Sequence, residues 1–161
     1  MLSRFWNQPS RAYRDFQLVY GALGLHFFFP ALGYLLSPET AMDSFTRLGA
    51  LLGAGTYPFS EQSMVWRVLA GTNVLTLAFL CFFIQADVRR HWPALYPLVF
   101  MKGTTSASFF LAYVLSTRYP AFLLVAFWDG LNCLFFIHFA RNARAAALAG
   151  EEGLVPRPLG A

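Results

Sequence analysis

Two long apolar runs, joined by a short polar turn, are the clearest indication of how this chain folds. They make up the stretch from Ala94 to Ala140, which reads ALYPLVFMKGTTSASFFLAYVLSTRYPAFLLVAFWDGLNCLFFIHFA. A helix needs about 20 predominantly apolar residues to cross the hydrocarbon core of a bilayer, and each run meets that length. Because the turn around Pro120 is so short, the two helices must be antiparallel neighbours. The stretch therefore predicts two transmembrane helices, at about 94–116 and 121–140.

Outside this stretch, two more runs have the length and composition of transmembrane helices, at about 17–36 and 65–85. The chain of 161 residues is 57% hydrophobic and only 12% charged. Soluble domains average about 45–50% apolar and about 25% charged residues, so this excess fits a protein whose exterior faces lipid. We therefore expect an all-α four-helix transmembrane bundle, with an interfacial segment at 1–15, a membrane domain at 16–144 and a cytoplasmic, partly disordered tail at 145–161.

Arginine clusters flank the four runs and predict how the chain is oriented in the membrane. Short cytoplasmic flanks of transmembrane helices are enriched in Lys and Arg. In a four-span topology the three Arg-rich flanks all fall on one side, which predicts that both termini are cytoplasmic. Eleven of the twelve basic residues are Arg, a bias that favours a GC-rich bacterial genome and hence the inner (cytoplasmic) membrane. The flanking arginines are Arg4, Arg11 and Arg14, then Arg89 and Arg90, then Arg141 and Arg144.

The connection between the first two runs is long enough to hold an element of its own. Ser37 and Pro38 are residue types that favour the start of a helix. Apolar residues then recur at helical spacing up to Gly53, a residue type that suits the end of a helix. We therefore expect a short amphipathic helix on the outer membrane surface or against the bundle. Its apolar residues are Met42, Phe45, Leu48, Leu51 and Leu52.

Only a few polar side chains lie inside the predicted spans, and each one needs a physical reason. A charged group at the centre of a bilayer costs at least about 2.5–3.5 kcal/mol. At about 1.5 Å of rise per residue, Lys102 and Asp129 lie at similar depths, about 12 and about 16 Å from the cytoplasmic side. Because they sit on neighbouring helices, we expect them to form an ion pair, with Asn73 and Asn132 as hydrogen-bond partners.

These intramembrane polar residues, together with His26 in the first span, have two interpretations. In the first, the ion pair is a structural clamp that fixes the register of the helices. In the second, the residues form a proton path or a ligand site. A single pair without further carboxylates makes a poor proton wire, which favours the clamp over the proton path.

His26 lies in the middle of the first span, where two roles are open to it. One is a neutral histidine that is hydrogen-bonded to a neighbouring helix, and the other is a haem ligand. His138 lies about 12–15 Å away in depth, too far for both histidines to bind one iron. We therefore expect no haem and no metal site. Cys81 and Cys133 lack metal-binding spacing, and we expect them to pack as small apolar residues.

Arg67 lies at the outer end of the second span, shortly after Glu61. An ion pair between Arg67 and Glu61 is one role that the sequence allows. The other is binding of Arg67 to a lipid phosphate at the outer face.

The function is the least determined property of this sequence. No catalytic motif is present, so no catalytic residue is predicted. The net charge of +4 is not arranged as a basic stripe with interleaved aromatics, which argues against nucleic acid as a partner. We expect a non-catalytic accessory or scaffolding subunit of a larger, for example energy-converting, membrane complex, with other membrane protein subunits and lipids as partners. The alternative is a site within the bundle for a lipid, sterol, quinone or pigment, in an isomerase or oxidoreductase subunit.

Overall fold

All the secondary structure in the described part of the chain is helical. The computed structural model describes residues 10–55, 64–116 and 118–150. Four helices in these ranges are long and apolar enough to cross a membrane, and no strand occurs there, which confirms the all-α fold class. The elements are α2 (Arg11–Leu36), α3 (Pro38–Leu51), α4 (Met64–Ala86), the short 3-10 helix η1 (Trp92–Ala94), α5 (Leu95–Leu115) and α6 (Pro120–Leu148).

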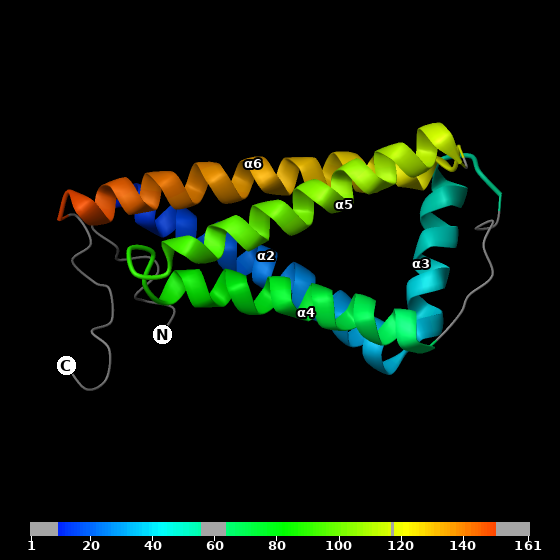
Figure 1. The fold of residues 1–161 in the computed structure, drawn as a ribbon, viewed down its shortest axis with the longest axis horizontal. Coiled ribbons are helices and arrows are strands. Elements are labelled where there is room, and N and C mark those ends of the chain that lie inside the picture. Colours follow the sequence, from blue (N-terminus) through cyan, green and yellow to red (C-terminus); the bar gives the residue numbers. More distant parts are fainter. Residues whose placement is uncertain (1–9, 56–63, 117, 151–161) are drawn as a thin grey trace.

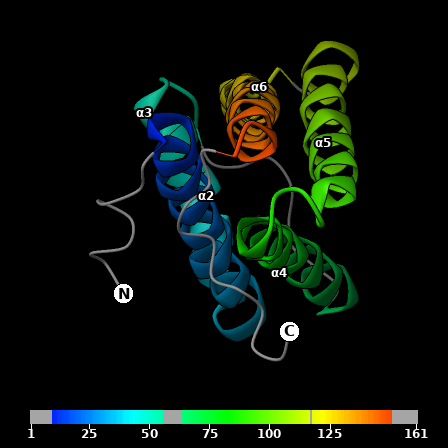
Figure 2. The ribbon, with the colours of Figure 1, turned by 90° about the vertical axis from the view of Figure 1, so that its left-hand side faces the viewer.

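The four long helices form two antiparallel pairs that meet at one end and separate toward the other. α2 packs along α4, α5 packs along α6, and contacts between α2 and α6 join the two pairs. Figure 1 shows the pairs close together where α2 begins and far apart at the end where α3 lies. Figure 2, which views the bundle from its end, shows the four helices around a common axis. The contact between α4 and α5 is weaker than each of these three contacts.

Two of the spans are longer than the apolar runs alone predict. α2 begins at Arg11 because Ser10 caps it: the side-chain oxygen of Ser10 accepts a hydrogen bond from the backbone N–H of Tyr13 at 3.4 Å. α6 continues to Leu148 because the segment after Arg144 is rich in alanine, the best helix former. An apolar run marks the part of a helix that lies in lipid, so it does not show where a capped helix ends.

The expected short amphipathic helix is present as α3, and it closes the wide end of the bundle (Figure 1). Gly53 follows it with a φ of 76°, a left-handed conformation that glycine adopts without strain. Gly49 on α3 lies against the ring of Tyr119, where a Cβ would overlap the phenol. The Tyr119 hydroxyl also donates to the carbonyl oxygen of Gly55 at 3.4 Å. α3 therefore docks on the start of α6 through a contact that requires a glycine.

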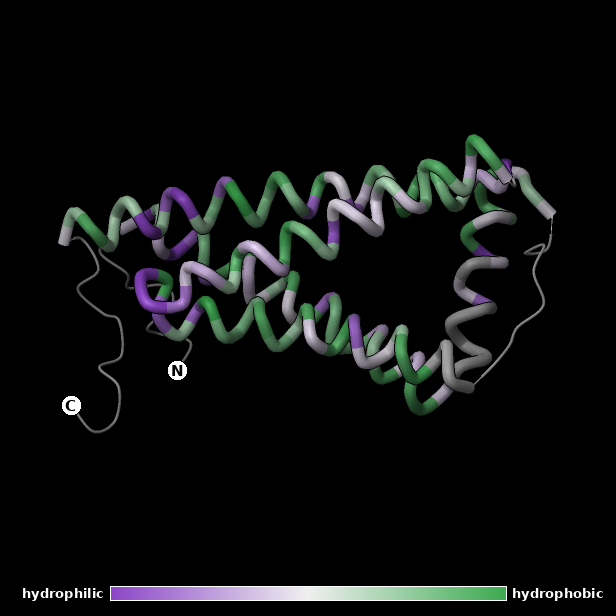
Figure 3. Tube along the Cα trace, in the orientation of Figure 1, coloured by the Kyte–Doolittle hydropathy of each residue, from purple (hydrophilic) through white to green (hydrophobic). Residues whose placement is uncertain are grey.

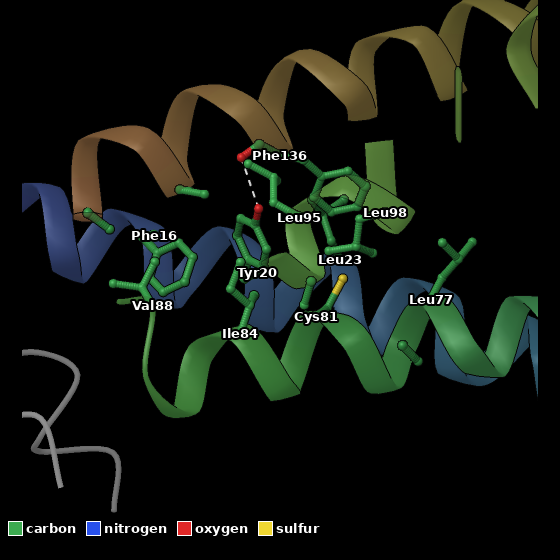
Figure 4. Packing of buried hydrophobic residues seen from close by; sticks show 14 of the residues in the cluster. Phe16, Tyr20, Leu23, Leu77, Cys81, Ile84, Val88, Leu95, Leu98 and Phe136 are labelled. Carbon is green, nitrogen blue, oxygen red and sulfur yellow. Dashed lines mark hydrogen bonds between the residues drawn. The ribbon is translucent and has the colours of Figure 1, made fainter. Parts of the chain in front are cut away.

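Buried apolar side chains form two separate clusters. The larger one, the inner core, fills the narrow half of the bundle, where Tyr20, Leu23, Leu98 and Phe136 pack together (Figure 4). The Tyr20 hydroxyl donates to the backbone carbonyl of Phe136 at 2.9 Å, so its polar end is satisfied. Cys81 is buried in the same cluster as a free thiol. The smaller one, the outer core, consists of Tyr119, Ala121 and Phe122 with Leu48, Ala54, Phe109, Ala112 and Tyr113 packed on them.

The arginine-rich segments gather at one end of the bundle. The start of α2, the connection from α4 to α5 and the end of α6 lie together at the narrow end in Figure 1. Figure 3 shows hydrophilic residues concentrated there, and mainly apolar residues along the spans. We call this end, which carries Arg11, Arg14, Arg89, Arg90 and Arg141, the arginine end. That the arginine end faces the cytoplasm stays a prediction from the enrichment of basic residues in cytoplasmic flanks.

Candidate functional site

A buried ion pair joins α5 and α6 in the middle of the membrane-spanning region. The Lys102 ammonium nitrogen lies 2.7 Å from a carboxylate oxygen of Asp129, and the two residues are only 8% and 3% exposed. The tight turn before α6 makes α5 and α6 antiparallel neighbours, which is why residues so far apart in the chain reach the same level. Pairing with a carboxylate offsets part of the cost of burying the ammonium in a low-dielectric interior.

The same lysine also contacts the third helix at this level. The ammonium group of Lys102 lies 4.6 Å from the centroid of the Phe27 ring on α2. A cation over an aromatic face is attracted by the negative charge density of the ring, and burial strengthens that attraction. Lys102 therefore links α2, α5 and α6.

Asn132 lies one helical turn along α6 from Asp129 and is completely buried, at 0% exposure. Neither its side-chain oxygen nor its side-chain nitrogen has a hydrogen-bond partner among the described residues. A buried amide without partners costs about 1–3 kcal/mol relative to a satisfied one. Asn132 can therefore both donate to and accept from a polar group that enters its surroundings. We call Lys102, Asp129 and Asn132 the buried polar site.

A second polar contact between α2 and α6 lies next to this site along the chain. The Trp128 indole N–H donates to Nε2 of His26 at 3.1 Å, and the two rings are nearly perpendicular. Both side chains are exposed at the surface of the bundle. Since Nε2 accepts this bond, His26 is neutral in this arrangement and carries its proton on Nδ1. The sequence allows His26 either a hydrogen bond to a neighbouring helix or a role as haem ligand, and this contact corresponds to the first of these roles.

The buried polar site interrupts the apolar core. Along α6, Phe122 belongs to the outer core and Phe136 to the inner core, and the buried residues between them are Ala126 and the two polar residues Asp129 and Asn132. Along α5, Lys102 likewise lies between Leu98 of the inner core and the residues that pack on the outer core. The arrangement is a small polar region enclosed between two apolar clusters. Chemically, it offers hydrogen-bond donors, an anionic acceptor and an unused amide.

Not every polar residue expected in this site lies there. Asn73 is exposed on α4, and no hydrogen bond joins it to Lys102 or Asp129. The reason is that α4 packs on α2 and contacts α5 only slightly. Glu61 lies outside the described residues, and the side chain of Arg67 is not described, so their expected contact stays a prediction.

Three contacts around the site come from residues that the sequence did not place in it. Phe27 and Trp128 are the partners of Lys102 and His26, and the hydroxyl of Ser106 donates to the carbonyl oxygen of Ala126 at 2.7 Å. An indole N–H inside a span needs an acceptor, and this is the one signal that points to Trp128 beforehand. Within the described ranges, no group of three or more His, Cys, Asp or Glu side chains is placed to hold a metal ion.

Comparison with known proteins found no matching family model, no matching curated protein and no matching solved structure. The class of protein is therefore defined by the fold and the site themselves. The four long apolar helices are those of an integral membrane protein, and a buried ion pair joins two of them.

Proposed function

We propose that this protein binds a small, largely apolar molecule inside its helix bundle and holds the polar group of that molecule at the buried polar site. The unpaired amide of Asn132, fully buried beside the ion pair of Lys102 and Asp129, is the observation that carries this proposal. Buried polar groups in native proteins nearly always have partners, so the Asn132 amide is suited to bond a polar atom from outside the chain. A lipid, sterol, quinone or pigment has the required combination of an apolar body and a polar group.

The donor and acceptor inventory favours an oxygen-bearing ligand. Lys102 has three N–H donors, and one of them is used by Asp129. Asn132 adds two donors and an acceptor, so a carbonyl or hydroxyl oxygen would find donors from two helices. The inner and outer cores lie on either side of the site and provide apolar surroundings for the rest of the molecule. Ligand sites in membrane bundles commonly combine an apolar lining with a few polar groups.

The proposed role is binding, not catalysis. Lys102 and Asp129 neutralise each other, and neither has a further titratable side chain hydrogen-bonded to it among the described residues. Chemistry on the ligand, as in an isomerase or an oxidoreductase subunit, would need one of them to exchange a proton with the ligand. Such an activity at this site is the alternative to the binding role proposed here.

The replacement Asn132→Leu tests the proposal, because leucine has a similar size and no hydrogen-bonding group. The protein is purified in mild detergent, extracted with organic solvent, and the extract is analysed by mass spectrometry. We expect a defined compound in the wild-type extract, at least about tenfold depleted in N132L. Loss of one or two hydrogen bonds to a buried group corresponds to about that factor. Asn73→Leu is the matched control, since Asn73 is exposed and lies outside the site, and it should retain the compound.

The stability of the same variants separates binding from a purely structural role. Removing an unpaired buried amide leaves the ligand-free protein as stable as the wild type or more stable. Wild-type protein that carries no compound in any gentle extraction, or N132L protein that carries it undiminished, would contradict the proposal.

A role as an accessory subunit of a larger membrane complex, located in a bacterial inner membrane, is a second proposal. What favours it is the number of large aromatic side chains on the exterior of the spans, including Phe29, Phe79, Phe100 and Phe127. Broad apolar surfaces of this kind suit contact with other membrane protein subunits as well as with lipid. Native mass spectrometry after gentle extraction tests this role, and a monomer under every condition counts against it.

A further inference from the structure

One groove runs along the lipid-facing side of α6. Two hollows lie on this side, and they share Leu131 and Leu134 in their linings, so they are continuous. Side chains along this surface recur every three or four residues, which places them in one stripe on the helix. We call this surface the α6 groove. The members of its stripe, from the wide end toward the arginine end, are Leu123, Phe127, Leu131, Leu134, His138 and Arg141.

The α6 groove is polar at one end and apolar over the rest of its length. Arg141, Asn142 and His138 line the arginine end, and the Asn142 amide nitrogen lies 3.1 Å from Nε2 of His138. Beyond His138 the lining is apolar except for Ser106, whose hydroxyl is bonded to the carbonyl oxygen of Ala126, and Leu134 and Phe127 are 64% and 68% exposed. A cation and an amide at one end, followed by a long apolar surface, match the polarity of a phospholipid along its length.

The dimensions of the groove fit the same molecule. From Arg141 to Leu131 the helix rises about 15 Å, which is half of the roughly 30 Å hydrocarbon thickness of a bilayer. A phosphate bound at Arg141 would therefore lie at the membrane interface, and an acyl chain would follow the stripe toward the middle of the bilayer. Gly103 and Ala107 of α5 and Gly130 of α6 border the inner part of the groove, and their small size leaves room for a chain.

We propose that the α6 groove is a binding site for an anionic phospholipid of the leaflet at the arginine end. The Arg141 guanidinium pairs with the phosphate, since planar guanidinium groups bind phosphate oxygens with two parallel N–H donors. The Asn142 amide adds a further donor beside it. One acyl chain lies on Leu134 and Leu131. This site is distinct from the buried polar site, because Asp129 and Asn132 are on the buried side of α6.

The headgroup half of the proposal is tested with Arg141→Gln in the full-length protein. Purified protein is equilibrated with phosphatidylglycerol or phosphatidylcholine in detergent, and retained lipid is counted by native mass spectrometry. We expect the wild type to retain phosphatidylglycerol preferentially, and we expect this preference to be about fivefold smaller in R141Q. This is the factor that corresponds to one basic residue near an anionic headgroup. Arg90→Gln is the matched control, because it removes the same charge at the same end of the bundle, outside the groove.

The acyl-chain half is tested with Leu134→Trp, which fills the middle of the groove. Leu124→Trp is its control, since Leu124 is also exposed on α6 but does not line the groove. We expect L134W to retain less lipid of either headgroup and L124W to behave as the wild type. The proposal is overturned if R90Q lowers the preference as much as R141Q does, or if L134W and L124W retain equal lipid. Circular dichroism confirms that each variant keeps its helix content.

Discussion

At the level of single residues, the burial of the ion pair between Lys102 and Asp129 has a large energetic consequence. Each charge is buried, so removing one partner leaves the other uncompensated in an apolar interior. Such removals cost about 3–5 kcal/mol in buried pairs, whereas replacing both partners with apolar residues is often close to neutral. We therefore expect the pair to contribute specificity of helix packing more than net stability.

A double-mutant cycle measures this coupling. We expect K102M and D129L each to lower the free energy of unfolding by about 3–5 kcal/mol, and the double variant to lose at least about 1 kcal/mol less than the sum. The measurement is reversible unfolding in mixed micelles, followed by circular dichroism. Strict additivity of the two single changes would show that the charges act independently, contrary to the geometry.

The sequence predicts how deep in the membrane each polar residue of the site lies, but it does not predict the direction of its side chain. The rise per residue places Lys102 and Asp129 at similar depths, and the tight turn makes their helices neighbours. Depth does not say which way a side chain faces around its helix axis. For that reason Asn73 has a suitable depth but is exposed on α4, and depth alone does not identify Trp128 as the partner of His26.

At the scale of elements, α3 shows what a regular apolar pattern can and cannot predict. The recurrence of apolar residues after Pro38 predicts the helix, and Gly53 marks its end. The pattern left open whether the helix lies on the membrane surface or against the bundle. The contact between Gly49 and Tyr119 answers that question, because the helix rests on the start of α6.

A substitution at Gly49 tests whether this contact holds α3 in place. In G49A, the added methyl group overlaps the Tyr119 ring, and we expect a loss of about 1–3 kcal/mol, as in other overpacked contacts. Gly33→Ala is the control, because Gly33 lies within α2 with open space around it and alanine favours the helix. Unfolding midpoints in detergent compare the two variants. Equal or greater stability of G49A would mean that α3 is not docked as described.

At the level of the whole molecule, the arrangement of two helix pairs determines where the cores, the buried polar site and the α6 groove lie. α2 with α4 and α5 with α6 converge at the arginine end, where the inner core lies, and diverge toward α3 (Figure 1). The buried polar site lies between the inner and outer cores, and the α6 groove runs along the outside of one pair. Composition and run length predict the four spans, but the divergence of the pairs depends on packing contacts that no local pattern encodes.

We expect the chain to cross the membrane four times, with its arginine end on the cytoplasmic side. Reporter fusions after Arg90, Arg118 and Leu148 test it most directly, with green fluorescent protein active inside the cell and alkaline phosphatase active outside. With four spans and a cytoplasmic arginine end, fluorescence is expected after Arg90 and Leu148 and phosphatase activity after Arg118. Placement of Arg90 and Leu148 on opposite sides of the membrane, or of Arg118 on the same side as Arg90, would contradict it.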